Sequence, residues 1–149
     1  MTVPLKPQNA ILAILVIATA TILGAWAFQL IGGYAPCPLC LQQRWPYYAT
    51  IPIAFFLLWS RRESLLRLGF LLIALIMLAS TLLALYHAGI EWRWWRGPQA
   101  CAGGAGLTGT LPDLSNLRVV RCDEAALRIL GLSLAGWNAL ISLLIAGIA

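Results

Sequence analysis

The sequence is poor in charge. Only 10% of its 149 residues are Asp, Glu, Lys or Arg, whereas 61% are hydrophobic and the mean hydropathy is +0.85. A water-soluble domain carries charge on about a quarter of its residues, so this composition excludes a soluble protein and indicates a membrane protein. The ten Lys and Arg residues are scattered between apolar runs and form no basic face, which argues against nucleic acid as a partner.

Motifs for common redox cofactors are also missing. No G-x-G-x-x-G follows a strand-like run, so we expect no flavin or nicotinamide site. Leu41, not His, follows the Cys37–Cys40 pair, which excludes the Cys-x-x-Cys-His attachment of c-type haem. The chemistry must therefore come from other residues, and the four cysteines are the first candidates.

Four long apolar stretches are present. Each has about the 20 residues that cross a hydrocarbon core of about 30 Å. We therefore expect an all-α membrane protein, a four-transmembrane-helix bundle that forms a single integral membrane domain over residues 1–149. The expected helices cover about residues 10–31, 41–60, 68–86 and 129–149.

Pro46 complicates the start of the second helix. A helix that begins at Trp45, with Pro46 in its first turn, would reach only ~22 Å, which is short of the hydrocarbon core. A start at Cys40 or Leu41 restores the length but requires a kink or a tightened turn at Pro46. We expect the longer helix.

Four crossings place both termini on one side of the membrane and two loops, about residues 32–40 and 87–128, on the other. These loops hold all four cysteines: Cys37, Cys40, Cys101 and Cys122. Lys and Arg are denser in the short segments beside the termini, which indicates that those segments face the cytoplasm. The cysteine loops then face an oxidising compartment.

The second of these loops has two notable parts. Four glycines in nine residues follow or flank Cys101, so the backbone can move and present this thiol to a partner. Further along, apolar residues recur every three positions and favour a short helix on the membrane surface: Leu111, Leu114, Leu117 and Val120.

Three uses of the cysteines compete. Structural zinc sites usually bring their ligands as two close pairs, but Cys101 and Cys122 are 21 positions apart, so we expect no metal. A structural disulfide across that loop would stabilise it by ~3 kcal/mol. The ring closed by Cys37 and Cys40 is too small for such a gain, whereas Cys-x-x-Cys geometry suits reversible redox exchange. Sequence spacing does not choose among the three possible pairings.

Residues around the Cys-x-x-Cys pair favour a reactive thiolate. Cys40 is expected at the N-terminal end of the second helix, where free N–H groups and the helix dipole favour an anion. Arg44 follows four residues later, on the same face of a regular helix, and should also favour the thiolate. We expect Trp45 to bound this site. His87, the only histidine, ends the third apolar segment, and its role stays open between structure and function.

A dithiol that becomes a disulfide releases two electrons, which must pass to an acceptor. Because no soluble cofactor motif is present, we expect the acceptor to be dissolved in the membrane. A lipophilic quinone fits, since it would approach laterally at the depth of Cys40 and Arg44.

Three segments, "CPLCLQQRWPYY", "YHAGIEWRWWRGPQAC" and "RCDEAALRILGLSLAGWNAL", resemble the disulfide bond formation protein B (DsbB) family. These are bacterial inner-membrane quinone reductases that reoxidise the periplasmic thiol oxidase DsbA, and the resemblance spans almost the whole chain. It implies a multi-pass protein of the inner membrane with its cysteine loops in the periplasm. It also implies ubiquinone or menaquinone as acceptor, no metal, and a thioredoxin-like, DsbA-like partner.

The resemblance further implies a division of labour. Cys40 would attack the quinone with Cys37 as its partner, and Arg44 would stabilise the thiolate and the reduced quinone. His87 would lie near the same pocket.

The other cysteine pair would receive the electrons first. Cys101 would be attacked by the incoming dithiol oxidase, and Cys122 would be its intramolecular partner. Electrons would then pass to the first pair through a transient Cys37–Cys122 bond.

Two alternatives are kept. One is a quinone-linked reductase related to vitamin K epoxide reductase, although the spacing and flanking residues favour the first family. The other is a non-catalytic membrane protein with structural disulfides or bound zinc.

Overall fold

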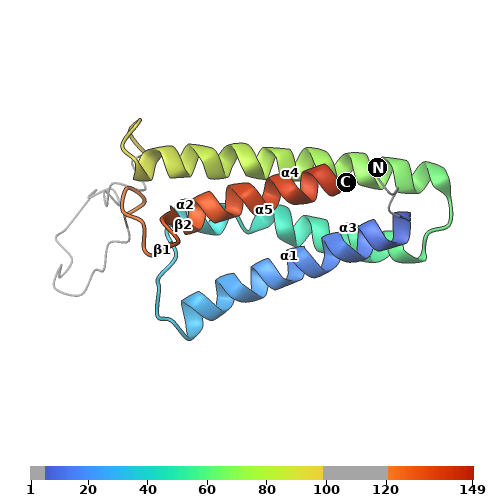
Figure 1. Cartoon of the computed structure of the whole chain (residues 1–149), viewed down its shortest axis with the longest axis horizontal. Coiled ribbons are helices and arrows are strands. Elements are labelled where there is room, and N and C mark those ends of the chain that lie inside the picture. Colours follow the sequence, from blue (N-terminus) through green and yellow to red (C-terminus); the bar gives the residue numbers. More distant parts are fainter. Residues whose placement is uncertain (1–5, 99–120) are drawn as a thin grey trace, which may run out of the picture.

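The computed structural model describes residues 6–98 and 121–149. This part of the chain is mostly helical, and its four longer helices lie roughly along one axis (Figure 1). A fifth, short helix and a small hairpin sit at one end of the bundle. The helices are α1 (Pro7–Leu30), α2 (Pro38–Gln42), α3 (Trp45–Trp59), α4 (Glu63–Glu91) and α5 (Leu134–Ile148).

The bundle is apolar inside and outside. Its core contains side chains from the four longer helices that no solvent reaches, including Ile11, Ala54, Met77 and Ile145. The outward faces also carry exposed apolar side chains: Leu23, Phe56, Leu82 and Leu143. A helix that is hydrophobic all round is typical of a membrane span, so the outer surface matches a lipid environment.

Two helices in the described ranges, α1 and α4, are long and apolar enough to cross a membrane. Helices α3 and α5 have 15 residues each and reach only ~22 Å. The prediction of a mainly helical protein is therefore confirmed, and two of the four expected spans have the length and apolar composition that a membrane span needs.

The second predicted helix is interrupted, so one continuous helix over residues 41–60 is wrong, whereas the tightened turn expected near Pro46 is present. Helix α2 ends at Gln42, and a turn separates it from α3, which begins at Trp45. The reason is Pro46, which has no N–H to donate to the Gln42 carbonyl and whose ring would clash with it. In the first turn of α3 the same residue is tolerated, because the N–H groups there have no helical partner.

The fourth helix begins at Leu134, so its predicted start at residue 129 is also wrong. A two-residue turn precedes it, with Leu130 at φ 53° and Gly131 at φ 84°, values typical of a tight hairpin and incompatible with a right-handed helix. Ser133 then caps α5 by accepting the Gly136 N–H at 3.2 Å. The paired strands are β1 (Arg128–Ile129) and β2 (Leu132–Ser133).

Helix α4 extends beyond the predicted range of 68–86 at both ends. Its last turn continues with no proline to interrupt it, and Gly89 leaves room there for the Trp95 ring, which a Cβ would meet. The Trp95 indole N–H donates to the Tyr86 carbonyl at 2.9 Å. The extension places Glu91 one turn after His87 on the same helix.

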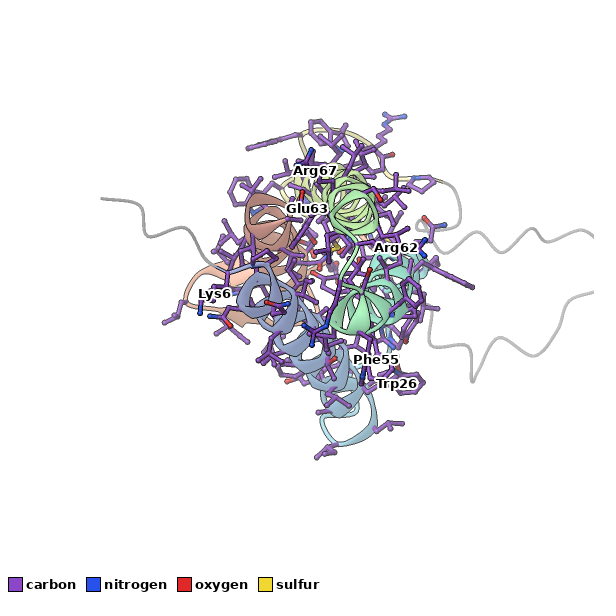
Figure 2. The ribbon with its side chains drawn as sticks, turned by 90° about the vertical axis from the view of Figure 1, so that its right-hand side faces the viewer. Lys6, Trp26, Phe55, Arg62, Glu63 and Arg67 are labelled. Atoms are coloured by element: carbon purple, nitrogen blue, oxygen red, sulfur yellow. The ribbon has the colours of Figure 1, made fainter. Side chains whose placement is uncertain are left out.

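The two ends of the bundle differ. The start of α1, the α3–α4 turn and the end of α5 lie at one end (Figure 1), where Lys6, Arg62 and Arg67 gather in the end-on view of Figure 2. Helix α2 and the hairpin lie at the other end and bring Cys37 and Cys122 into one buried cluster. Cys101 and the expected surface helix fall outside the described residues.

Candidate functional site

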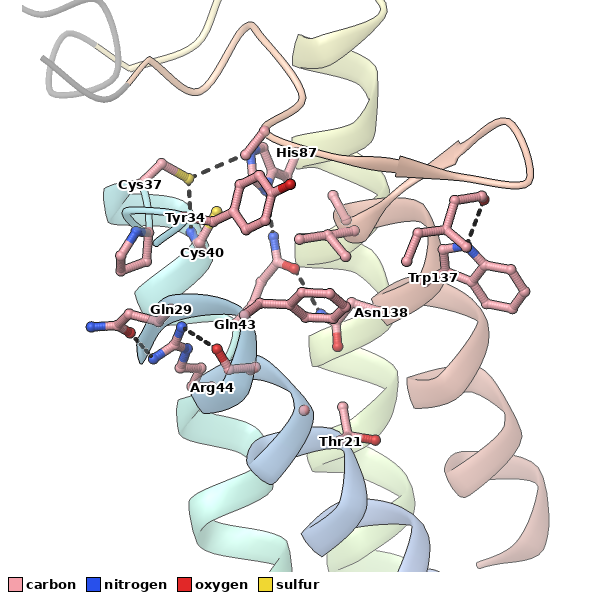
Figure 3. Close-up of a pocket in the computed structure, with 18 of the residues that line it drawn as sticks. Thr21, Gln29, Tyr34, Cys37, Cys40, Gln43, Arg44, His87, Trp137 and Asn138 are labelled. Atoms are coloured by element: carbon pink, nitrogen blue, oxygen red, sulfur yellow. Dashed lines mark hydrogen bonds between the residues drawn. The ribbon is translucent and has the colours of Figure 1, made fainter. Parts of the chain in front are cut away.

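A cavity of about 520 Å³ opens at the end of the bundle that holds α2. Its walls come from α1, α2, the starts of α3 and α5, the end of α4 and the hairpin (Figure 3). Most of the lining is apolar, and Ile22, Phe28 and Ile141 contribute to it. The predicted site residues Cys37, Cys40, Arg44 and His87 all line this one cavity.

Cys37 and Cys40 are free thiols at the two sides of the first turn of α2. Cys37 is buried and caps the helix: its sulfur accepts the Cys40 N–H at 3.1 Å. Pro38 follows as the first helical residue, where its missing N–H has no cost. The sequence placed Cys40 at the helix N-terminus, and the structure places Cys37 there and Cys40 one turn later.

The two thiols share a proton unequally. A hydrogen bond from the Cys37 thiol lowers the pKa of Cys40, and the nearby charge of Arg44 contributes in the same direction. The same hydrogen bond, together with burial, raises the pKa of Cys37. Both shifts favour the thiolate form of Cys40 over that of Cys37.

This shared proton predicts how alkylation of Cys40 depends on pH. In reduced protein, the rate should reach half its maximum below the ordinary cysteine pKa of about 8.5. Cys37→Ala removes the donor and should move that midpoint upward, whereas Cys37→Ser keeps a hydroxyl donor and should move it less. Iodoacetamide labelling followed by peptide mass analysis measures this; identical midpoints in all three proteins would contradict it.

Arg44 is held against α1. One guanidinium nitrogen donates to Gln29 Oε1 at 2.7 Å and another to the Ala25 carbonyl at 3.4 Å, and the group lies over the Trp26 ring at 5.5 Å. The regular helix expected to join Cys40 and Arg44 is interrupted by a turn, in which the Arg44 N–H bonds to the Leu41 carbonyl at 3.1 Å. The charge of Arg44 nevertheless acts on Cys40, as expected. Arg44 presents its charge from the cavity wall.

His87 is buried beside the cysteine pair. Its Nε2 lies 3.7 Å from the Cys37 sulfur and 3.9 Å from Glu91 Oε1. Its Nδ1 lies 2.7 Å from Gln43 Nε2, and because an amide nitrogen only donates, Nδ1 accepts and Nε2 carries the ring proton. His87 thus has a single N–H donor, which faces Cys37 and Glu91, and the ring also hydrogen bonds to the backbone of Cys122.

A chain of polar side chains continues from His87 into the bundle. The Gln43 carbonyl oxygen accepts from the Asn138 amide at 2.7 Å, and Asn138 in turn accepts from the Tyr47 hydroxyl at 2.6 Å (Figure 3 shows the first of these). Ser142 and Ser80 extend the chain at 3.0 Å each. This network links the cysteine end to the middle of the bundle and fixes the ring of His87.

Cys122 belongs to the same end of the molecule. It is disulfide-bonded and buried, and it forms one apolar cluster with Cys37, Leu39 and Ile90. Cys122 therefore lies beside the Cys37–Cys40 pair. The other predicted redox cysteine, Cys101, lies outside the described residues.

Several polar residues of the site were not identified as functional from the sequence. Glu91, Gln29 and Asn138 all line the cavity, and the available signal was the rarity of polar residues next to or within apolar stretches. Trp45, which was expected to bound the site, is 71% exposed and does not line the cavity. Trp26 instead packs against the Arg44 guanidinium, and Trp137 is the tryptophan that lines the cavity.

Two kinds of ligand fit this arrangement. An apolar cavity with a few convergent polar groups is typical of sites for small organic molecules, and its size suits a quinone ring. The ligand atoms of Cys37, Cys40 and His87 also lie within 4.8 Å of one another, a spacing that a metal ion accepts.

Comparison with known proteins gives one family. Residues 7–149 match the family model of "Disulfide bond formation protein DsbB". The chain is also similar to the "Uncharacterized protein RP370" of Rickettsia prowazekii (strain Madrid E), with 28% identity over 145 residues that cover 93% of this chain and 81% of that protein. No solved structure matches.

Proposed function

This chain belongs to the disulfide bond formation protein DsbB family, whose members are inner-membrane oxidoreductases, and from this membership we propose a specific reaction for it. The protein is a thiol:quinone oxidoreductase that reoxidises a periplasmic, DsbA-like dithiol oxidase and passes two electrons to ubiquinone or menaquinone. The observation that carries the proposal is the opening of a Cys-x-x-Cys pair into the same apolar cavity as Arg44 and His87.

The overall step at this pair balances. The reduced Cys37–Cys40 pair and a quinone become a disulfide and a quinol: two S–H bonds are lost, one S–S bond forms, and two electrons and two protons reach the quinone. Cys40 is the thiolate that reacts, because its pKa is lowered by the Cys37 thiol. Arg44 favours negative charge on the reduced oxygen from its place on the cavity wall.

Electrons reach this pair from the second one. In the proposal, the partner dithiol attacks Cys101, Cys122 is released as a thiolate, and that thiolate attacks the oxidised Cys37–Cys40 pair through a transient bond to Cys37. Support comes from the burial of Cys122 and Cys37 in one cluster, since thiol exchange requires contact between the sulfurs.

The proposed setting is the bacterial inner membrane with four crossings. The end of α2 from residue 41 on together with α3, and the hairpin with α5, would supply the two spans that neither 15-residue helix completes alone, which leaves Cys37 and Cys40 at the periplasmic face. The exposed cations Lys6, Arg61, Arg62 and Arg67 at the end opposite the cavity favour a cytoplasmic location for that end. The cavity and the cysteines then face the periplasm.

A steady-state assay tests the proposal. Full-length protein in detergent is mixed with a reduced thioredoxin-like dithiol oxidase and a soluble quinone, and the quinone absorbance is followed. We expect one quinone to be consumed for each partner disulfide formed. A partner that becomes oxidised with no loss of quinone, or no reaction at all with either substrate, would contradict the proposal.

A further inference from the structure

The Glu91 carboxylate lines the cavity but takes no part in the proposed reaction. The Glu91 side chain is only 5% exposed, and its Oε2 has no hydrogen-bond partner in the ranges that the structure describes. Ser133 hydrogen bonds to this carboxylate, and Arg128 is the cation whose charge acts on it. A buried carboxylate with an unsatisfied oxygen is costly unless something pairs with it.

The neighbours of Glu91 are metal-ligand types at metal-ligand spacing. In a tetrahedral zinc site, bonds of about 2.3 Å to sulfur and about 2.0 Å to nitrogen and oxygen place sulfur and nitrogen about 3.5 Å apart, and nitrogen and oxygen about 3.3 Å apart. Here Cys37 Sγ lies 3.7 Å and Glu91 Oε1 3.9 Å from His87 Nε2. Cys40 Sγ is within 4.8 Å of both Cys37 Sγ and His87, so shifts of up to about one ångström bring these three atoms onto one ion. Glu91, whose Oε1 approaches His87, would complete the set by a movement of its own side chain.

The polar chain behind His87 can support a metal on Nε2. A metal-bound imidazole must lose the proton from that nitrogen and carry it on Nδ1, where it needs an acceptor. If the side-chain amides of Gln43 and Asn138 are both flipped by about 180°, the Gln43 oxygen accepts the proton on Nδ1. Each of the following hydrogen bonds, from Gln43 to Asn138 and on to Tyr47, then still joins one donor to one acceptor. Tyr47 then accepts from Asn138 and donates to Ser142, a direction that the 3.0 Å contact allows.

We propose that the reduced Cys37–Cys40 pair, His87 and Glu91 form a tetrahedral site for a borderline-soft divalent cation such as Zn²⁺. Binding releases the thiol protons, forms four bonds from ligand to metal and moves no electrons. The disulfide form lacks thiolates and does not bind, so the ion holds the pair reduced and competes with quinone. This set differs from the four-cysteine zinc site considered from the sequence, since it uses two cysteines together with a histidine and a carboxylate.

The inference goes beyond the proposed function, because metal binding needs only the reduced thiols. Cobalt serves as the probe: full-length protein in detergent is reduced, freed of reductant under anaerobic conditions and titrated with Co²⁺. We expect one Co²⁺ per chain, with thiolate-to-cobalt charge-transfer absorption and the intense visible bands of four-coordinate cobalt. Added Zn²⁺ should displace it, and protein oxidised at the Cys37–Cys40 pair should give no such bands.

Variants test the ligand set. Glu91→Gln should weaken Co²⁺ binding at least about tenfold, whereas Glu63→Gln, an exposed carboxylate at the other end of α4, should leave it unchanged. Cys40→Ser and His87→Ala should remove or alter the charge-transfer band. Absence of the bands in reduced wild-type protein, or equal affinity in the Glu91→Gln and wild-type proteins, would overturn the proposal.

The redox proposal is tested by a separate measurement of quinone reduction without metal. Quinone consumption by chelator-treated protein reports on the redox reaction alone. Cobalt binding without quinone reduction would contradict the oxidoreductase proposal and still support the metal site. We expect Zn²⁺ to slow quinone reduction at concentrations that fully displace Co²⁺ from the site. An unchanged rate at those concentrations would contradict the competition between metal and quinone.

Discussion

Cys40→Ser is expected to consume quinone no faster than a sample without protein. The serine hydroxyl keeps the size and the hydrogen bond of the side chain, but it does not ionise near neutral pH and cannot form a disulfide with Cys37. The cavity, Arg44 and His87 remain in place in this variant. The loss of quinone reduction is therefore due to the missing Cys40 sulfur. It is measured with the quinone absorbance assay described above.

The control for this variant is the other half of the reaction. Because the second cysteine pair is untouched, the Cys40→Ser protein should still oxidise one equivalent of the partner dithiol. If the Cys40→Ser protein has lost this exchange as well, we conclude that it is misfolded. Cys40→Ala would then be measured in its place. Quinone reduction at the wild-type rate by a folded Cys40→Ser protein would contradict the assignment of Cys40.

Arg44→Ala is expected to slow the quinone half-reaction by about 10- to 100-fold and leave partner-disulfide exchange within a factor of two. The range corresponds to a hydrogen bond with a charged group, about 1.5–3 kcal/mol, at the oxygen that becomes negative. Arg44→Lys should recover part of the rate, since it keeps the charge but loses the planar fork that binds Gln29 and Ala25. Stopped-flow measurement of each half-reaction separates the two effects.

The matched control is Arg96→Ala. Arg96 is an exposed cation at the same end of the molecule and does not line the cavity. It should change neither half-reaction. Equal losses in both half-reactions for Arg44→Ala would mean that Arg44 only anchors α3 to α1 and has no part in the chemistry.

Much of the architecture could be predicted because it depends on composition. Long apolar runs require helices in lipid, since every backbone N–H and C=O must be satisfied within the segment. This argument identifies α1 and α4 and places Cys37 and Cys40 near the end of an apolar bundle. It depends on no single residue, so it tolerates errors in helix bounds.

The helix ends could not be predicted from hydropathy, because local chemistry decides them. Pro46 interrupts an apolar run that hydropathy reads as continuous. Leu130 and Gly131 are apolar or small, yet their positive φ values form a hairpin where a helix was expected. Hydropathy also gives no reason to extend α4 as far as Glu91, which is buried next to His87.

For the site, too, the residues could be predicted from the sequence but the contacts among them could not. Cys37, Cys40, Arg44 and His87 were identified as candidates, and the structure brings all four to one cavity. The contacts among them depend on the break between α2 and α3, which turns Arg44 toward Gln29 on α1. A pairing of this kind joins helices far apart in the sequence, and spacing within one helix cannot reveal it.

A single-turnover experiment tests the central claim most directly. Full-length protein is reduced, freed of reductant and mixed anaerobically with one equivalent of quinone in the absence of metal and partner, and its peptides are then mapped without reduction. The account predicts one quinol per chain and, with Cys101→Ser and Cys122→Ser in place so that internal thiol exchange cannot move it, a new disulfide between Cys37 and Cys40. Quinol formation with both thiols still free, or a quinone that stays oxidised in the presence of the dithiol, would contradict it.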